Sequence, residues 1–382
     1  MFHKSLSFFL LCAGFVLSGV STASAEVTQT TKVEPFGTMP DGRIVNKYSV
    51  TNASGSSVSF MNLGATILTL EVPDRSGKMA DVVLGFDTFE PYLENAPYFG
   101  TVVGRYGNRI NKGQFFLGGK KVQLNTNDGP NHLHGGNKGF NKLYWSGRLI
   151  ETGEGAGVRF RVTSQDGDEN YPGDIHVVLD YIFTPTNELK LSYRITALDD
   201  TIANITQHSY FNLGGHNSGS VLDHLLQINA DYYTPIDKTS IPTGEILKVD
   251  GTPSDFTREK PIGRDINKKH PQLKHGLGYD HNWVLKQSEF AQDLHTAVVL
   301  TDPASGRVLT LTTDLPGQQF YSGNFMDGKI IGKDDAAYSY RGAIVLETQF
   351  FPDSPNHPHF PRTRMRAGQT QVSKTVYAFS VE

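Results

Sequence analysis

The sequence predicts an all-β fold, and three observations lead to that prediction. Several runs alternate apolar and polar side chains with a period of two, as strands with one buried face do. The 39 glycines and 19 prolines are spread along the chain and supply turns between these runs. No long stretch has the apolar spacing of a helix. We therefore expect one large domain of stacked antiparallel sheets over residues 26–382.

The clearest strand covers residues 189–196, where the sequence Leu-Lys-Leu-Ser-Tyr-Arg-Ile-Thr places the large apolar side chains on one face. Asp302–Arg307 has a turn sequence and predicts a hairpin between two further runs. Only Thr88–Asn95 is compatible with a turn or two of helix. The other predicted strands are Tyr48–Asn52, Ile67–Val72, Val158–Val162, Val177–Phe183, Ala297–Leu300, Val308–Thr312 and Val376–Val381.

The first 25 residues have the pattern of a cleaved export signal. Lys4 precedes a mostly apolar stretch at residues 5–20, and residues 23–25 (Ala-Ser-Ala) form the small-x-small sequence of a signal-peptidase site. We expect cleavage before Glu26 and a location in the periplasm or outside the cell. The apolar stretch is too short for a comfortable membrane span, so no membrane association is expected after cleavage.

The composition of the mature chain excludes several classes of function. Cys12, the single cysteine, lies in the signal segment, so we expect neither disulfides nor a catalytic thiol. Cleavage removes one lysine and no acid, which changes the formal charge from −4 to −5. This mildly acidic balance, with scattered charges, argues against nucleic acid or an anionic membrane as a partner.

Residues 341–353 (Arg-Gly-Ala-Ile-Val-Leu-Glu-Thr-Gln-Phe-Phe-Pro-Asp) predict a buried strand that carries an acid in its middle. Strand alternation places Glu347 on the face of Val345, opposite Ile344 and Leu346. A carboxylate at such a position is costly to bury unless it is paired or hydrogen-bonded. Two interpretations are open here: Glu347 has a structural partner, or it faces a cleft where its charge is used.

Two glycine-containing polar clusters lie in the first half of the chain. Gly104–Ile110 contains Asn108 and Arg109, which offer several hydrogen-bond donors, although a surface turn with a salt bridge has the same composition. The sequence Asn-His-Leu-His-Gly-Gly follows at residues 131–136, and its two histidines, His132 and His134, have the spacing of some metal sites. No further ligand lies nearby in a recognised metal pattern, so we expect no metal.

Three further clusters follow. Around Thr206–Leu213, strand parity places His208 and Tyr210 on the more polar face, opposite to what a core histidine would need. Both a site and a histidine hydrogen-bonded within the sheet remain open. Asp280 lies close to a tryptophan, a combination that occurs both in sugar sites and in ordinary turns. Gln319 offers both a donor and an acceptor.

Together these clusters resemble the aldose 1-epimerase (galactose mutarotase) family, and the resemblance covers the chain from about residue 33 to its end. It implies a β-supersandwich of large antiparallel sheets with a sugar site in a concave cleft. Seven motifs occur in the family's order: Arg-Tyr-Gly-Asn-Arg-Ile, His-Leu-His-Gly-Gly, Asn170-Tyr-Pro-Gly173, His-Ser-Tyr-Phe-Asn-Leu, Ile241-Pro-Thr-Gly-Glu245, Tyr-Asp-His-Asn and Leu-Glu-Thr-Gln-Phe-Phe-Pro-Asp.

The resemblance also implies residue roles. Glu347 corresponds to the general base and His208 to the general acid, and if the two lie close we expect each to favour the charged form of the other. The sequence departs from the commonest family pattern at Gly107 and His132, and we assign His132 no role. The implied sugar-binding positions are Asn108, Arg109, His134, Asp280 and Gln319, with Ser209 and Tyr210 beside the acid.

The implied reaction is the interconversion of the α and β anomers of a free hexose, which needs a monosaccharide partner and neither metal nor cofactor. Three alternatives remain open. A hexose-6-phosphate epimerase would need a further basic residue, for which Arg105 is the spare candidate. A non-catalytic sugar-binding protein would be expected to lack His208 or Glu347, yet both are present. A glycoside hydrolase would use two carboxylates, for which Asp280 and Glu347 are available.

Overall fold

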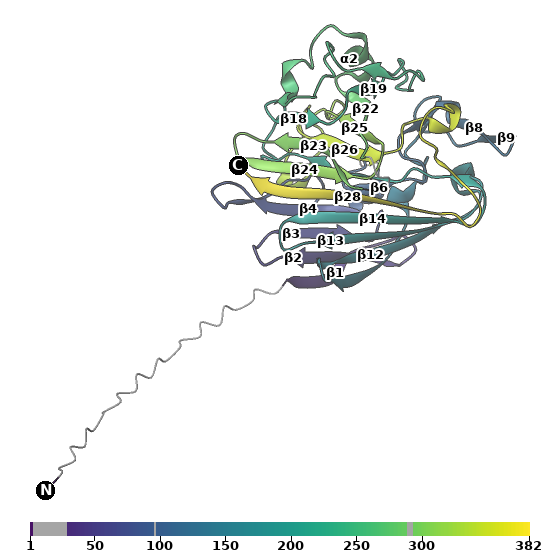
Figure 1. Cartoon of the computed structure of the whole chain (residues 1–382). Helices are drawn as coiled ribbons and strands as arrows, with labels where there is room; N and C mark the ends of the chain where they lie inside the picture. Colours follow the sequence, from purple (N-terminus) through teal and green to yellow (C-terminus); the bar gives the residue numbers. More distant parts are fainter. Residues whose placement is uncertain (3–28, 95–96, 289–292) are drawn as a thin grey trace.

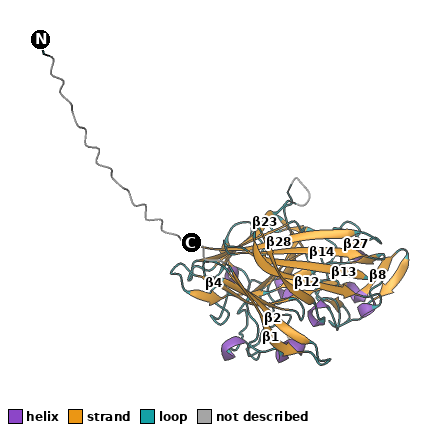
Figure 2. Cartoon of the chain, turned by 90° about the horizontal axis from the view of Figure 1, so that it is seen from below, coloured by secondary structure: helices purple, strands orange, loops and turns teal. Residues whose placement is uncertain are grey.

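The computed structural model describes residues 1–2, 29–94, 97–288 and 293–382, so most of the predicted export signal lies outside the described residues. Antiparallel sheets dominate the described part, which confirms the predicted all-β class (Figures 1 and 2). None of its helices is both long and apolar enough to cross a bilayer.

Helical structure is confined to short segments. Helix α1 (Glu90–Leu93) falls inside the predicted range Thr88–Asn95, whereas α2 (Pro271–Gly276) was not predicted. Helix α2 begins at a proline and is capped by His270, whose side chain accepts from the backbone N–H of Gln272. Six residues make fewer than two helical turns, which is too short to show a helical period in the sequence. Single 3₁₀ turns occur at Asn111–Gly113, Phe140–Lys142, Asp168–Asn170, Ile262–Arg264, Lys333–Asp335 and Ser354–Asn356.

A nine-stranded antiparallel sheet forms one layer of the molecule. Its C-terminal strand β28 lies in the middle, between β14 and β24, and so joins the two halves of the chain (Figure 1). The predicted hairpin is present between β23 and β24. The order is β11 (Ser146–Thr152), β12 (Gly155–Ser164), β13 (Ile175–Phe183), β14 (Glu188–Ala197), β28 (Thr370–Val381), β24 (Arg307–Thr313), β23 (His295–Thr301), β18 (Leu225–Ile228) and β21 (Lys260–Pro261).

A five-stranded sheet packs on part of this layer. The ring of Phe60 stacks on Tyr181 at a centroid distance of 4.7 Å, and Tyr48 meets Phe160 edge-on at 5.6 Å. These contacts belong to a hydrophobic cluster that runs from Tyr48 to Phe379, which is compatible with the predicted single domain. The strands are, in spatial order, β1 (Thr30–Thr38), β2 (Ile44–Thr51), β3 (Ser57–Met61), β4 (Thr66–Pro73) and β5 (Met79–Asp81).

A six-stranded sheet carries most of the polar motifs. Ile344 and Leu346 of β26 enter the shared core, and Thr348 Oγ1 lies 2.7 Å from Thr375 Oγ1 of β28. Glu347 therefore points away from the nine-stranded sheet, as the alternation predicted. The strands are, in spatial order, β17 (Tyr210–Phe211), β26 (Ile344–Gln349), β25 (Gly317–Tyr321), β22 (Asp280–Val284), β19 (Tyr232–Thr234) and β20 (Leu247–Lys248).

Four two-stranded ladders complete the described strands. Two of them bring the remaining motifs to the six-stranded sheet, because one contains His208 and another joins Arg109 to Leu133. The pairs are β6 (Thr101–Val103) with β16 (Thr206–His208), β7 (Arg109–Ile110) with β10 (His132–Leu133), β8 (Gln114–Leu117) with β9 (Lys120–Gln123), and β15 (Thr201–Ile202) with β27 (Arg364–Met365).

Candidate active site

A cavity of about 180 Å³ brings together seven of the nine residues that the sequence singled out. They come from separate strands and turns that only the folded chain places side by side. We call this space the catalytic cavity. Its lining residues are Pro97, Tyr98, Asn108, Arg109, Leu133, His134, His208, Tyr210, Asp280, Tyr321, Phe325 and Glu347.

Glu347 and His208 face each other in this cavity. His208 Nε2 lies 3.8 Å from Glu347 Oε1, and the two residues are only 5% and 2% exposed. This separation is too long for a direct hydrogen bond. Glu347 Oε2 and His208 Nδ1 also have no hydrogen-bond partner among the described residues. The carboxylate and the imidazole therefore lie close together, and each has a polar atom that is free to hydrogen-bond to a bound molecule.

Burial, and not mutual attraction, dominates the protonation of this pair. It raises the pKa of Glu347 to about 8, with a further increase from Asp280 that Arg109 opposes. It lowers the pKa of His208 to about 4. The expectation that each residue favours the charged form of the other is therefore wrong for the free cavity, because desolvation penalises both ions. Between about pH 4 and pH 8 the pair holds one proton, and in the free cavity Glu347 carries it.

Asn108 and His134 are joined by two hydrogen bonds that fix their relative positions. The backbone N–H of Asn108 donates to His134 Nδ1 at 3.1 Å, and the backbone N–H of His134 donates to the Asn108 carbonyl at 3.1 Å. Both residues adopt the left-handed backbone region, with φ of 62° and 50°. Such conformations are uncommon for residues other than glycine and are often retained at functional sites.

The hydrogen bond from the Asn108 backbone N–H to His134 Nδ1 also determines whether His134 can bind a metal ion. His134, His208 and Glu347 offer three ligand atoms within 4.8 Å of one another, a donor set that zinc accepts. However, an Nδ1 that accepts a hydrogen bond requires the proton of a neutral imidazole to sit on Nε2. A metal-bound histidine normally donates from its other nitrogen, whereas His134 accepts there. His134 is therefore arranged to donate a hydrogen bond from Nε2 and not to bind a metal ion.

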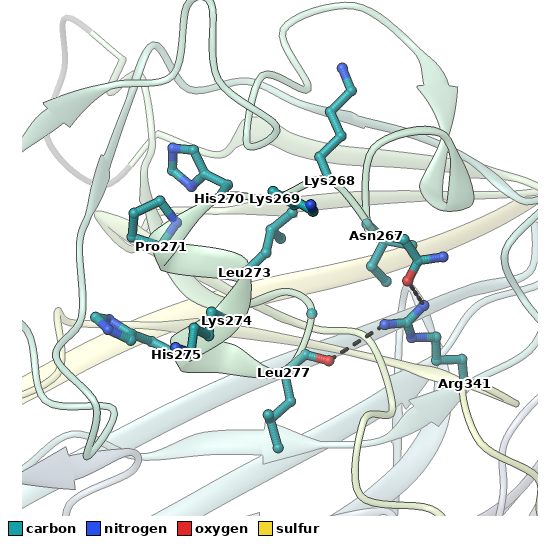
Figure 3. Close-up of a pocket in the computed structure, with 12 residues that line it drawn as sticks. Asn267, Lys268, Lys269, His270, Pro271, Leu273, Lys274, His275, Leu277 and Arg341 are labelled. Atoms are coloured by element: carbon teal, nitrogen blue, oxygen red, sulfur yellow. Dashed lines mark hydrogen bonds between the residues drawn. The ribbon is translucent and has the colours of Figure 1, made fainter.

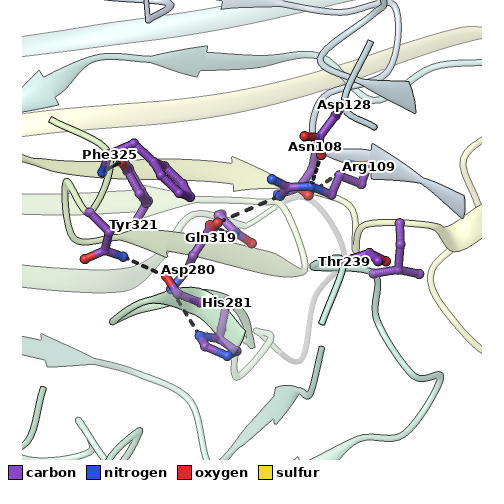
Figure 4. A network of polar contacts seen from close by, with 12 residues as sticks. Asn108, Arg109, Asp128, Thr239, Asp280, His281, Gln319, Tyr321 and Phe325 are labelled. Carbon is purple, nitrogen blue, oxygen red and sulfur yellow. Dashed lines mark hydrogen bonds and ion pairs between the residues drawn. The ribbon is translucent and has the colours of Figure 1, made fainter. Parts of the chain in front are cut away.

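Arg109 is held between the carboxylates of Asp128 and Asp280 (Figure 4). Its Nε donates to Asp128 Oδ2 at 2.7 Å, and its Nη1 lies 3.8 Å from Asp280 Oδ2. Burial alone would lower the pKa of Arg109, but Asp280 and Asp128 raise it above its usual value. Gln319 Nε2 donates to the other Asp280 oxygen at 2.7 Å. The network presents oriented donors and acceptors, which suits the hydroxyl groups of a small polar ligand.

Two predicted residues do not line the catalytic cavity. Gln319 of β25 lies directly opposite Glu347 of β26 in the sheet. Its side-chain amide donates to the carboxylate of Asp280. Ser209 is 1% exposed and lies between His208 and Tyr210. Successive side chains of an extended segment point to opposite faces, so the Ser209 side chain is turned away while its two neighbours line the cavity.

Four residues were not predicted from the sequence: Asp128, which accepts from Arg109, and the cavity-lining aromatic residues Tyr98, Tyr321 and Phe325. Tyr98 packs against the rings of both His134 and His208, at centroid distances of 4.8 and 5.6 Å. Phe325 is 61% exposed at the cavity and stacks on Tyr321 at 5.7 Å. The turn sequence Asn-Asp-Gly-Pro before His132 was a signal for Asp128, but Tyr98 and Phe325 have no distinguishing local pattern.

Arg105 and His132 have structural roles. Arg105 is 1% exposed, and its guanidinium donates to the Gly173 carbonyl at 2.6 Å and to Ser164 Oγ at 2.7 Å. It does not line the catalytic cavity and is not available there for a phosphate. His132 is buried between Tyr171 Oη, at 2.5 Å from its Nε2, and the Asn125 carbonyl, at 2.6 Å from its Nδ1. The absence of a predicted role for His132 agrees with this position.

The chain matches a known family over most of its length. The model of the aldose 1-epimerase family matches residues 46–378. A galactose mutarotase of Bos taurus is 44% identical over 350 residues, which is 91% of this chain and 97% of that protein. The Homo sapiens galactose mutarotase is 43% identical over 347 residues, with the same coverage. An aldose 1-epimerase of Escherichia coli K12 is 35% identical over 345 residues, or 90% of this chain and 97% of that protein.

Solved structures agree. The aldose epimerase homologue of C. elegans superposes with a TM-score of 0.79 at 31% identity, covering 87% of this chain and 98% of that one. Galactose 1-epimerase of Lactobacillus acidophilus superposes with a TM-score of 0.82 at 26% identity, covering 93% and 99%. Because the family model, the relatives and the folds coincide over nearly the whole described chain, this protein belongs to the aldose 1-epimerase family.

Proposed function

We propose that this protein interconverts the α and β anomers of free hexoses, glucose and galactose among them, by acid–base opening and closing of the sugar ring. The observation that carries the proposal is the 3.8 Å approach of His208 and Glu347 in a buried polar cavity. Family membership supports the same reaction, and the relatives named above are called galactose mutarotases or aldose 1-epimerases.

Ring opening removes a proton from the C1 hydroxyl while the ring oxygen receives one. In the proposed assignment Glu347 accepts the first proton and His208 donates the second. This state has the same single proton as the free pair, moved from Glu347 to His208. The charge of Arg109 already lowers the pKa of Glu347, and a sugar hydroxyl that donates to the carboxylate would lower it further. After rotation about the C1–C2 bond, the two groups exchange roles and the ring closes on the other face.

The remaining cavity residues would hold the sugar. Arg109 and Asn108 supply donors, and Asp280 accepts from hydroxyls while Gln319 and Arg109 hold its carboxylate. His134 donates from Nε2, since its Nδ1 is occupied by the Asn108 N–H. Tyr98 covers both imidazoles and excludes water from them. A site of this kind discriminates against analogues that lack a matching hydroxyl.

Polarimetry tests the proposal directly. Freshly dissolved α-D-glucose and α-D-galactose should relax to the equilibrium rotation faster with the purified protein, while the total sugar concentration stays constant. Consumption of a disaccharide would indicate a glycosidase. Binding without faster relaxation would indicate a non-catalytic sugar-binding protein, and both results would contradict the proposal.

Phosphorylated hexoses are disfavoured as substrates. Among the described residues, Arg109 is the only lysine or arginine that lines the catalytic cavity, and its Nε already donates to Asp128 at 2.7 Å. The spare candidate Arg105 is buried elsewhere. Glucose 6-phosphate should therefore relax at close to its uncatalysed rate under conditions where glucose is accelerated.

We also propose that the protein is exported and acts in the periplasm after cleavage before Glu26. The support is the sequence of residues 1–25, with its single lysine, apolar stretch and Ala-Ser-Ala site. Cell fractionation with N-terminal sequencing tests this proposal. A cytoplasmic protein that retains residue 4 would contradict it.

A further inference from the structure

A second and larger cavity, of about 740 Å³, is lined by residues of helix α2 and by Arg341 (Figure 3). We call it the basic pocket, because the described residues that line it include four lysine and arginine residues, two histidines and no acid. Gly278 lines the basic pocket and Asp280, two residues further along, lines the catalytic cavity. The lining residues are Ile266, Asn267, Lys268, Lys269, His270, Pro271, Leu273, Lys274, His275, Leu277, Gly278 and Arg341.

Arg341 is a buried cation that has no counter-ion among the described residues. It is 6% exposed, and no carboxylate of the described residues lies within 4.0 Å of it. Its guanidinium donates only to neutral oxygens, the Asn267 Oδ1 at 3.0 Å and the Leu277 carbonyl at 3.5 Å, and its Nε has no hydrogen-bond partner among the described residues. Burying such a charge is unfavourable unless it is paired.

The lysines of the basic pocket add to this positive charge. Lys268 is paired with Asp265 at 2.7 Å. Lys269 and Lys274 are exposed and form no ion pair with the described part of the chain. Two unpaired lysines and a buried unpaired arginine around one hollow produce a local positive potential in a protein that is acidic as a whole.

The segments that line the basic pocket and the catalytic cavity are in contact. The backbone N–H of Arg341 donates to the Gly323 carbonyl at 3.1 Å, and Phe325 two residues later lines the catalytic cavity. Leu277, Phe325 and Tyr340 are 55%, 61% and 50% exposed, and the Arg341 guanidinium lies over the Tyr340 ring at 4.6 Å. Exposed apolar side chains thus occur at both hollows, where the faces of sugar rings can pack.

We propose that the basic pocket binds an acidic group, a carboxylate or a phosphate. This group is carried either by a free small anion or by the distal end of an oligosaccharide whose reducing-end hexose occupies the catalytic cavity. The second source rests on the proposed function, and the first does not. Arg341 supplies the buried charge, and Lys269 and Lys274 supply flexible donors at the rim.

Two measurements on the whole mature protein distinguish these sources. Calorimetric titration with citrate and with inorganic phosphate, at constant ionic strength set by chloride, measures binding of a free anion. Enzymatic anomer exchange followed by NMR, with 3′-sialyllactose and lactose as matched acidic and neutral substrates, measures recognition of an acid on the sugar. Binding in the first, or a KM for sialyllactose below that for lactose in the second, supports the proposal.

The variants Arg341→Gln and the double change Lys269→Ala/Lys274→Ala should weaken that binding or raise that KM about tenfold, as expected for the loss of charge-assisted contacts. The double variant changes only exposed side chains and serves if Arg341→Gln does not fold. Arg159→Gln and Lys120→Ala/Lys121→Ala are the matched controls, because they remove surface cations elsewhere. Relaxation of free glucose should be unchanged in all of them.

The proposal is overturned if neither anion gives saturable binding and sialyllactose has no advantage over lactose. It is also overturned if both effects survive in the double variant and in Arg341→Gln. Failure of the wild-type protein to accelerate glucose relaxation would instead refute the proposed function, and the titration would still decide whether the basic pocket binds free anions.

Discussion

His208 and Glu347 enter the catalytic cavity from different sheets, yet His208 Nε2 lies 3.8 Å from Glu347 Oε1. His208 ends β16, which pairs with β6, and Glu347 lies in β26 of the six-stranded sheet. Neither sheet alone contains both groups. The short distance between His208 and Glu347 therefore depends on how the two sheets pack against each other.

Removing either member of the pair should abolish most of the activity without unfolding the protein. Glu347→Gln and His208→Ala are each expected to lower kcat by about 10²–10⁴-fold, the usual loss for a positioned acid or base. Polarimetry with α-D-glucose measures the effect, and circular dichroism checks the fold. Glu188→Gln and His176→Ala, which change residues of the nine-stranded sheet, are the matched controls. Near-normal rates in the cavity variants would contradict the assignment.

The rate should depend on pH in a bell shape, because the reaction needs one proton on the pair. Below about pH 4 His208 is also protonated, so no base remains. Above about pH 8 Glu347 has lost its proton, so no acid remains. We expect kcat/KM for glucose to be highest between these limits and to fall on both sides. Measured values must be corrected for the uncatalysed reaction at each pH, and a rate that keeps rising from pH 8 to 10 would be incompatible with this pair.

Glu347→Gln should also stabilise the protein, and more so at alkaline pH. The folded-state pKa of Glu347 is raised from its ordinary value of 4.5 to about 8, so the wild-type protein loses stability as the pH rises through this window. A glutamine does not ionise and avoids this loss, which has an upper bound of about 5 kcal/mol. Denaturant unfolding of both proteins at pH 5 and pH 8.5 measures it. An equal difference at the two pH values would show that Glu347 is not desolvated in the folded state.

Asp128 should matter for substrate binding although it is partly exposed. Its carboxylate accepts from Arg109 Nε at 2.7 Å and so orients the remaining guanidinium nitrogens toward Asp280. Asp128→Asn is expected to raise the KM for glucose roughly tenfold with a much smaller effect on kcat, because a charge-assisted hydrogen bond is weakened. Asp128→Glu should restore part of the binding.

The control for Asp128 is another aspartate that pairs with an arginine. Asp180→Asn removes the partner of Arg159, whose Nε lies 2.6 Å from the Asp180 carboxylate on the nine-stranded sheet. It should leave KM unchanged. A fall in kcat equal to that of the Glu347 variant would show that Asp128 acts in the chemistry and not in positioning.

Much of the fold followed from local patterns. The alternation of β14 was visible because only one of its faces is fully buried, which gives the sequence a period of two. Strand β26 is buried on both faces and was predicted from its run of β-branched and large apolar residues. Helix α2 was missed because it has six residues, and its cap is an ordinary His-Pro dipeptide. The same limit applies to Tyr98 and Phe325, whose positions at the catalytic cavity depend on contacts between distant segments.

The sequence by itself determined the all-β class and the family resemblance, because these depend on residue type and short-range order, and the resemblance in turn implied the candidate acid and base. Only the tertiary structure decided that Glu347 faces a cavity shared with His208, that Ser209 is turned away from it and that Arg105 is a structural residue. It also decided the direction of the two pKa shifts, since desolvation depends on what surrounds a group and not on its neighbours along the chain.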